Sequence, residues 1–297
     1  MSGTTLLTGA TGYVGGRLLE ALEEEGSRVR CLVRRPDALA GRVGPGTEVV
    51  AGDVLDAETT RRALAGVDVA YYLVHALASR GRFEDAELRG ARTFAEAARD
   101  AGVARIVYLG GLGSGELSPH LATRQEVGRL LRASGAVTVE FRASIVIGAG
   151  SGSFELVRAL ADRLPVMVAP RWLRTPAQPI AIDDVIAYLV AARARPAGST
   201  VYEIGGPDRV AYADLIRAYA RARGLRRILV PVPLLSPRLS ALWLTLVTPS
   251  HARVGRRLIE SLRHATVVED DRALEDFPEI RPIGVEAAIT DALATHS

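Results

Sequence analysis

The sequence is poor in cysteine and in aromatic residues, and it has no long hydrophobic run. Its single cysteine, Cys31, excludes an internal disulfide and fits a reducing compartment, so we expect a cytoplasmic protein. Aromatic residues make up only 5% of the 297 residues, so aliphatic side chains must build the core that an apolar content of 48% allows. No apolar run approaches the ~20 residues that span a bilayer, and a strand pattern beside Met1 argues against a signal peptide.

Long basic runs are also absent. The formal net charge is +3, and the arginines are scattered along the chain. Proteins that bind nucleic acid usually show a basic stripe or tail, so this pattern argues against that class. We therefore expect no nucleic-acid partner, no metal and no transmembrane segment, and the sequence leaves a homodimer open.

Strand and helix patterns alternate through the first half of the chain. Such alternation predicts βαβ units, and hence an α/β fold of the Rossmann type, with a doubly wound parallel sheet and helices on both faces. The expected strands are Thr4–Thr8, Val29–Val33, Glu48–Ala51, Val67–Val74, Arg105–Leu109 and Val137–Arg142, and the expected helices are Val14–Glu25, Ala57–Ala65, Phe83–Ala101 and Leu121–Ala133.

A glycine-rich loop, GATGYVG, joins the first strand to the first helix. The first glycine of such a loop permits a tight turn, the second lets the backbone approach a pyrophosphate, and the third lets the helix pack close to the sheet. The start of the helix then offers free N–H groups to phosphates. A glycine turn without a ligand is the alternative, but the strand–loop–helix context favours a dinucleotide. The expected cofactor residues here are Gly9, Thr11, Gly12, Tyr13, Val14 and Gly15.

The end of the second strand bears on the choice of cofactor. NAD sites usually place an acid there for the ribose 2′-hydroxyl, whereas this strand ends in Arg34 and Arg35. The guanidinium group of arginine matches a 2′-phosphate, so we expect NADP(H) rather than NAD(H). The alternative is that the two arginines are ordinary surface residues. After the third strand, Asp53 and Val54 lie where the adenine is expected, and Asp53 is also a candidate cap of the following helix.

The regular alternation of strand and helix patterns ends near residue 148. The segment LPVMVAPRWLRTPAQPI is punctuated by proline and looks irregular, IDDVIAYLVAAR predicts a helix with Asp183 as its N-cap, and TVYEIGG predicts a strand. We predict an NAD(P)-binding domain over residues 1–150 and a smaller, mostly helical substrate-binding region over residues 151–297. Strands and helices within residues 180–206 are expected to return to the first domain.

Several segments, in order over about residues 4–206, resemble the short-chain dehydrogenase/reductase superfamily. The chain is most similar to its atypical, extended branch of NAD(P)H-binding proteins, which includes the NmrA-like and complex I accessory-subunit types. The resemblance is carried by TGATGYVGGRLL, AGDVLD, YYLVHAL, RIVYLGGLG, SPHLATRQEVGRLL, FRASIVIGAGSGSFELV and QPIAIDDV.

The chain departs from this family at the catalytic pair, which is a tyrosine followed four residues later by a lysine. The matching segment places His120 at the tyrosine position and Arg124 at the lysine position, and the usual serine is replaced too, since only Ser114 lies near. An imidazole titrates near neutral pH and can exchange a proton without a lysine to tune it. Arg124 would supply a fixed positive charge for a phosphate, a ribose or a developing oxyanion.

His75, at the end of the fourth strand, is the third catalytic candidate. In a doubly wound sheet, His75 and His120 both lie at the carboxyl edge, where ligands bind. The alternative for each is a hydrogen-bonded structural histidine. Ser118 and Pro119 fit the N-cap and first position of the helix that carries His120.

The resemblance implies that substrate residues come from the loops after the fifth and sixth strands and from the C-terminal helices. We single out Ser144, Phe154 and Trp172. A helical stripe follows, which is either core-facing or the wall of a pocket for a bulky apolar substrate. A peripheral membrane contact is less favoured without a strong basic face. The stripe consists of Leu235, Leu239, Leu242, Trp243, Leu246 and Val247.

The leading hypothesis is an NADP(H)-dependent oxidoreductase acting on an apolar carbonyl or activated alkene. One alternative is a non-catalytic NADP(H)-binding redox sensor or assembly protein, which the NmrA-like and complex I relatives favour. Another is an isomerase or epimerase that retains its cofactor. The fold alone cannot choose among the three, because function belongs to the site.

Overall fold

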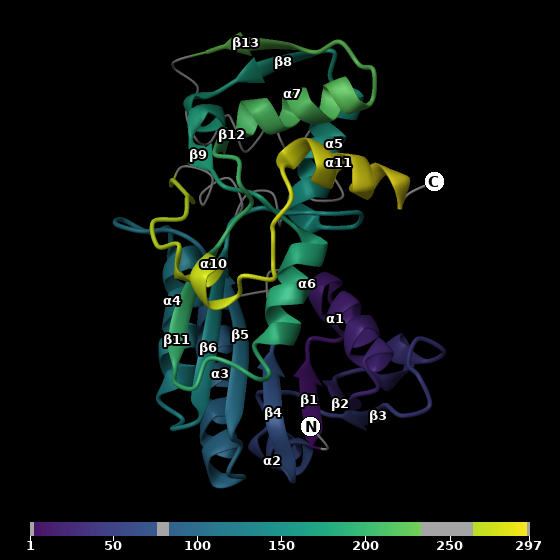
Figure 1. Cartoon of the computed structure of the whole chain (residues 1–297), viewed down its shortest axis with the longest axis vertical. Coiled ribbons are helices and arrows are strands. Elements are labelled where there is room, and N and C mark those ends of the chain that lie inside the picture. The colour runs from purple at the N-terminus through teal and green to yellow at the C-terminus, as the bar shows by residue number, and fades with distance from the viewer. Residues whose placement is uncertain (1–2, 76–82, 233–263, 296–297) are drawn as a thin grey trace.

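The structure is a computed structural model that describes residues 3–75, 83–232 and 264–295. A seven-stranded, fully parallel sheet forms its centre, in the order β11-β6-β5-β4-β1-β2-β3 (Figure 1). These strands are β1 (Thr4–Thr8), β2 (Arg28–Val33), β3 (Glu48–Ala51), β4 (Val67–Tyr72), β5 (Arg105–Gly111), β6 (Val137–Ala143) and β11 (Thr200–Ile204). The predicted Rossmann-type α/β fold is confirmed.

Helices cover both faces of the sheet because successive strand residues point to opposite sides. Leu7 and Tyr71 pack against α1 (Tyr13–Glu24) and α6 (Ile182–Ala191) on one face. Leu6 and Tyr108 pack on the other face against α2 (Ala57–Leu64), α3 (Phe83–Asp100) and α4 (Pro119–Arg132). The two apolar clusters hold the sheet between two helical layers.

The strand order reverses beside β1, which pairs with β2 on one side and β4 on the other. The chain runs outward from β1 to β3, then returns to β4 and continues to β11 on the other side. In an open parallel sheet, ligands bind at the carboxyl ends of the strands where this reversal occurs. The fold therefore places the loop after β1 at the expected ligand position.

The part after β6 builds a third apolar cluster above this edge of the sheet (Figure 1). It contains α5 (Gly152–Arg163), α7 (Tyr212–Ala222), α11 (Val285–Ala294), the short helix η2 (Arg171–Arg174), and a parallel ribbon of β8 (Val166–Ala169) and β13 (Ile228–Pro231). Short pairs β7 (Val146–Ile147) with β10 (Ile180–Ala181) and β9 (Pro176–Ala177) with β12 (Val210–Ala211) complete it. The helix α10 (Arg272–Asp276) packs instead beside β11, where Ala273 belongs to the cluster of Leu7 and Tyr71.

Two local predictions for this part are wrong. The segment expected to be irregular contains β8, η2, β9 and β10, because its prolines fall at strand and helix ends. The N-cap of α6 is Ala181 rather than Asp183, which lies in the first turn of the helix. By contrast, β11 pairs with β6, so a strand within residues 180–206 does join the main sheet. The division at residue 150 stays a prediction.

Within the described residues, no helix is both long enough and apolar enough to cross a bilayer.

Candidate functional site

The glycine loop after β1 is held tightly against its surroundings. Gly9 has φ of +77°, and a Cβ atom on it would lie 2.4 Å from the carbonyl oxygen of Leu73. A Cβ atom on Gly15 would lie 2.1 Å from the carbonyl oxygen of Gly9, so the helix could not pack this close with any other residue. The N-cap of α1 is Gly12, and no side chain caps the helix. Its first N–H groups are therefore available to a ligand.

A cavity of about 400 Å³ opens beside this loop at the carboxyl edge of the sheet. The residues fit a dinucleotide, because the loop leaves no room for side chains and the uncapped helix end faces the cavity. The cavity is lined by Gly9, Thr11, Gly12, Tyr13, Val14, Gly15, Leu32, Val33, Arg34, Gly52, Asp53, Val54, Leu73, Val74, His75, Leu109, Arg124 and Gly152. All the predicted cofactor residues except Arg35 are in this lining.

Arg34 and Arg35 occupy different positions. Both are exposed, but Arg34 lines the cavity whereas Arg35 lies outside the lining. Asp53 also lines the cavity, and its Oδ1 atom accepts a hydrogen bond from the Leu55 N–H at 3.0 Å. The alternative in which Asp53 caps the next helix is wrong, because the N-cap of α2 is Asp56, which accepts from the Glu58 N–H at 2.9 Å.

A second cavity, the crevice, adjoins the first and has a volume of about 290 Å³. It runs from the glycine loop across the ends of β5 and β6 to Tyr212 at the start of α7 and to Thr266. Both cavities are lined by His75 and Arg124, and the crevice is lined by His120 as well. The residues common to both cavities are Tyr13, Val14, His75, Leu109, Arg124 and Gly152. The three predicted catalytic residues thus meet at one junction.

The two histidines at this junction are in ring contact. The ring centroids of His75, just after β4, and His120, in the first turn of α4, are 5.1 Å apart. The Nδ1 atom of His75 lies 2.7 Å from an oxygen of Glu87, a residue of α3 whose side chain is 3% exposed. If Glu87 is ionised, its carboxylate can only accept, which assigns the proton to Nδ1 and leaves Nε2 as the atom of His75 that exchanges a proton elsewhere. Ser118 caps α4 and Pro119 begins it, as predicted.

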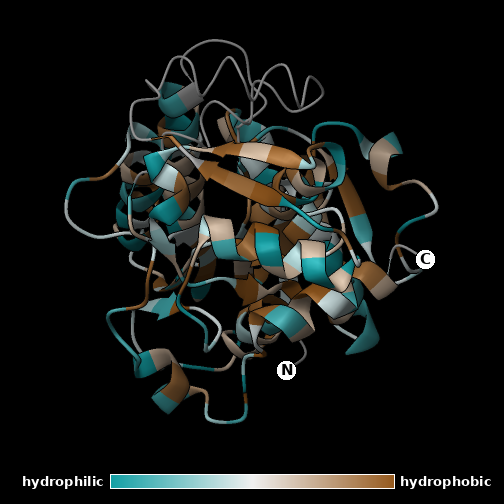
Figure 2. Ribbon diagram, turned by 90° about the horizontal axis from the view of Figure 1, so that it is seen from above, coloured by the Kyte–Doolittle hydropathy of each residue, from teal (hydrophilic) through white to brown (hydrophobic). Residues whose placement is uncertain are grey.

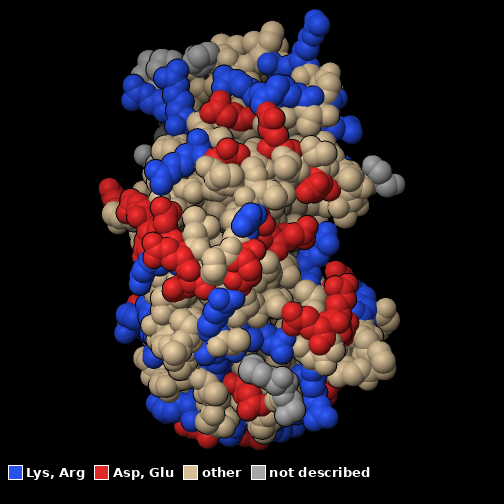
Figure 3. All heavy atoms as spheres, in the orientation of Figure 1, with Lys and Arg blue, Asp and Glu red and all other residues tan. Residues whose placement is uncertain are grey.

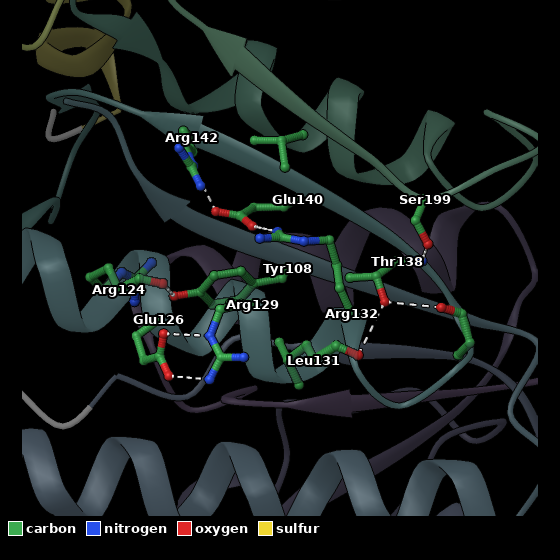
Figure 4. Close-up of polar contacts among 12 residues, drawn as sticks. Tyr108, Arg124, Glu126, Arg129, Leu131, Arg132, Thr138, Glu140, Arg142 and Ser199 are labelled. Carbon is green, nitrogen blue, oxygen red and sulfur yellow. Dashed lines mark hydrogen bonds and ion pairs between the residues drawn. The ribbon is translucent and has the colours of Figure 1, made fainter. Parts of the chain in front are cut away.

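Arg124 is fixed by β5 beneath it. Its guanidinium donates to the carbonyl oxygen of Leu109, and its Cζ atom lies 5.3 Å from the centre of the Tyr108 ring. The Tyr108 hydroxyl donates to the backbone carbonyl of Arg124 at 2.9 Å, as Figure 4 shows. Cation–π contact and two hydrogen bonds therefore hold one turn of α4 against the sheet. Arg124 reaches the junction as a fixed positive charge.

Tyr13 lies between the cavities with a buried hydroxyl that has no hydrogen-bond partner among the described residues. Burial raises the pKa of Tyr13 to about 12, and the charge of Arg17 opposes this rise only in part. A buried polar atom without a partner is costly, so this hydroxyl is a candidate donor to a ligand at the junction.

The predicted substrate residues are divided among three places. Ser144 lines the crevice, where its hydroxyl is 2.6 Å from that of Thr266. Trp172 lines a small apolar cavity next to it and is 8% exposed, and its indole Nε1 has no hydrogen-bond partner in the described part of the chain. Phe154 lies in the apolar cluster against Tyr219 and lines neither cavity. The predicted stripe from Leu235 to Val247 lies outside the described residues.

Three residues of the site have no distinctive signal in the sequence. Glu87 is one of several acids in a helical pattern, and its pairing with His75 depends on how α3 packs beside β4. Thr266 reaches the crevice from more than a hundred residues beyond Ser144. Tyr212 lines both the crevice and the small apolar cavity, and so joins them.

Comparison with known proteins supports the cofactor site. The profile of an NAD(P)H-binding family matches residues 9–146. The ceramide reductase of Caulobacter vibrioides is 30% identical over 237 residues, which cover 78% of this chain and 74% of that protein. A ketoreductase of Stigmatella aurantiaca, named for a 4-hydroxy-2-methyl-3-oxo-4-farnesyl-3,4-dihydroquinoline-1-oxide substrate, is 26% identical, with 92% of this chain and 90% of that protein aligned.

The fold also matches solved structures. The triphenylmethane reductase of Citrobacter sp., in complex with NADP(H), superimposes with a TM-score of 0.78 at 16% sequence identity. The match covers 97% of this chain and 99% of that one. At this identity the likeness shows the fold alone.

Proposed function

Because the chain belongs to the atypical, extended branch of the short-chain dehydrogenases/reductases, a family of NAD(P)H-binding oxidoreductases, we propose that it reduces a carbonyl or activated alkene of an apolar substrate with NADPH. The observation that carries this proposal is the meeting of His75, His120 and Arg124 where the two cavities join. The first cavity would hold the nucleotide and the crevice would hold the substrate.

The bound nicotinamide would supply the hydride, and the chain's own residues provide position and a proton. His120 would give a proton to the substrate oxygen or carbon from the crevice side. His75, whose Nδ1 is hydrogen-bonded to Glu87, would lie next to His120 and reprotonate it. Arg124 would stabilise negative charge as it develops on the substrate, because its guanidinium is already fixed before the reaction begins.

Arg34 favours NADPH over NADH in this proposal. It lines the cofactor cavity at the end of β2, where an NAD site usually places an acid. A guanidinium there matches a ribose 2′-phosphate.

An apolar substrate is supported by the walls of the crevice and the small cavity beside it. Leu156, Val157, Leu160, Trp172 and Ile216 surround the small cavity, which meets the crevice at Ser153 and Tyr212. An apolar tail would extend from the junction toward this cavity. The names of the ceramide reductase and of the farnesylquinoline ketoreductase describe substrates of this general kind.

The test is steady-state oxidation of NADPH with long-chain and prenylated ketones as acceptors. His120→Ala should lower turnover on the order of 10²-fold, the usual cost of losing a general acid. His264→Ala is the matched control, because His264 lines none of the described cavities, and it should retain the wild-type rate. Nucleotide binding without NADPH oxidation by any acceptor would contradict the proposal, and so would full activity in His120→Ala.

A further inference from the structure

The ribbon formed by β8 and β13 presents an apolar face to solvent. In the parallel register Ile228 pairs with Val166 and Val230 pairs with Val168, so these four side chains share one face. Val166, Ile228 and Val230 are 56%, 61% and 42% exposed, whereas Met167 on the opposite face is 1% exposed. In the view from above, the two strands are largely brown (Figure 2).

This face is unusual for the chain. Among the described residues, five large apolar side chains are strongly exposed, and three of them are on this ribbon. The other two, Leu55 and Leu274, are isolated on separate elements. An apolar patch on a two-stranded ribbon marks a surface that another molecule covers.

Positive charge is concentrated around the same ribbon. Residues 157–175 and 215–232 contain nine arginines and one acid, a formal charge of +8, in a chain whose net charge is +3, so the remaining sequence carries −5. Figure 3 shows basic side chains gathered at the top of the molecule, the end that α7, β8 and β13 form in Figure 1, with acidic side chains mostly lower down. The scattered arginines of the sequence thus become a basic surface in the fold.

Part of this charge is available to a partner. Arg158, Arg217 and Arg221 pair with carboxylates. Within the described residues, five other arginines of these segments make no ion pair; Arg227 donates to backbone carbonyls, and the remaining four are exposed. These are Arg171 and Arg174, which follow β8, and Arg223 and Arg226, which precede β13. Guanidiniums without an ion pair among the described residues therefore lie at both ends of the apolar ribbon.

We propose that this ribbon and its arginines dock the protein on an anionic lipid surface. The exposed side chains are aliphatic and offer no hydrogen-bond donor or acceptor, which suits an acyl layer better than the polar rim of a protein partner. Arginines at both ends match the negative charge of anionic headgroups, each strengthening attachment about fivefold. The partner that combines both properties is a membrane interface.

The docked ribbon would stand directly above the small apolar cavity. Met167, on its inner face, belongs to the same cluster as Leu160, Trp172 and Ile216, which line that cavity. A lipid-soluble substrate could then pass from the bilayer to the crevice without crossing water. This last step rests on the proposed function, whereas docking itself does not.

Vesicle flotation of the full chain tests docking without any turnover measurement. Wild-type protein should float with vesicles of phosphatidylcholine and phosphatidylserine, and much less with phosphatidylcholine alone. Arg223→Ala with Arg226→Ala should weaken partition about 25-fold at low salt. Arg28→Ala, at the amino end of β2 and remote from the ribbon, is the charge control.

A second pair of variants tests the apolar face. Ile228→Ser should weaken partition about tenfold through lost burial, and Leu274→Ser, a change to an exposed leucine outside the ribbon, should have no effect. Circular dichroism and thermal unfolding establish that each variant is folded. Failure of the wild type to float, or equal partition of Ile228→Ser and Leu274→Ser, would overturn the proposal.

Light scattering without vesicles identifies a competing occupant. Self-association of the wild type that Ile228→Ser abolishes, with no flotation, would assign the face to a second copy of the chain and overturn lipid docking. Turnover of a short, water-soluble ketone by Ile228→Ser separates the two proposals. A normal rate with lost flotation supports docking, and the absence of any turnover in wild type would count against the proposed function alone.

Discussion

Replacement of Gly128 by alanine should destabilise the protein, although alanine is the better helix former. A Cβ atom on Gly128, in α4, would lie 2.0 Å from Oε2 of Glu140 in β6. The Glu140 side chain is fully buried and forms ion pairs with Arg132 and Arg142 (Figure 4). An added methyl group must therefore displace either the helix or the buried carboxylate.

The magnitude follows from two opposing contributions. Glycine to alanine inside a helix ordinarily stabilises by about 0.5–1 kcal/mol. Disrupting a buried ion pair costs about 3–5 kcal/mol. The net loss in the free energy of unfolding should thus be about 2–4 kcal/mol, which lowers Tm by roughly 5–10 °C in a chain of this size.

Gly16→Ala in α1 is the matched control, because the nearest atom to its Cβ would be 3.5 Å away. Urea unfolding followed by circular dichroism should show no loss of stability for this control. An unchanged or higher stability for Gly128→Ala would refute the view that Glu140 anchors α4. Because α4 carries His120 and Arg124, turnover of Gly128→Ala should fall even below its unfolding temperature.

Two other substitutions test the junction and the cofactor cavity. Glu87→Gln keeps an acceptor for Nδ1 of His75 but removes the negative charge, so kcat should fall about tenfold while the Kd of the nucleotide stays unchanged. Glu96 is exposed on the same helix, and Glu96→Gln should leave kcat intact. Equal effects of the two substitutions on kcat would contradict the pairing of Glu87 with His75. Arg34→Ala should weaken NADPH binding about 10- to 100-fold and NADH binding far less, as measured by calorimetry. Arg35→Ala should not alter the ratio of the two dissociation constants. Equal weakening of NADPH and NADH binding by Arg34→Ala would show that Arg34 is not the basis of a preference for NADPH.

Local patterns were enough to predict the main sheet. The bounds of β1 and β3 agree with the expected ranges, because each is a short apolar run between turn residues. β4 ends two residues early at Tyr72, where the chain turns to bring Leu73 against Gly9. β5 extends to Gly111, since pairing with β6 continues through glycines that have little strand preference of their own.

The pairing of elements that are far apart in the chain could not be predicted from the sequence. β8 and β13 are about sixty residues apart, and each was too short and too close to proline to be recognised alone. The partner of His75 could not be predicted for the same reason, because any acid on one face of α3 would have satisfied the pattern. Candidate residues could be named from chemistry, but their partners required the packing of one element on another.

Under the proposed function, an imidazole suits proton transfer in this crevice better than a phenol. The chain contains no lysine, so no ammonium is available to lower the pKa of a tyrosine. Burial raises the pKa of Tyr13 to about 12, and burial also raises the pKa of Tyr108, with Arg124 opposing it only in part. A general acid works best when its pKa is near the working pH, and both phenols are far above it. The Tyr108 hydroxyl is engaged in fixing Arg124, so under the proposed function proton transfer would fall to His120 and to His75 behind it.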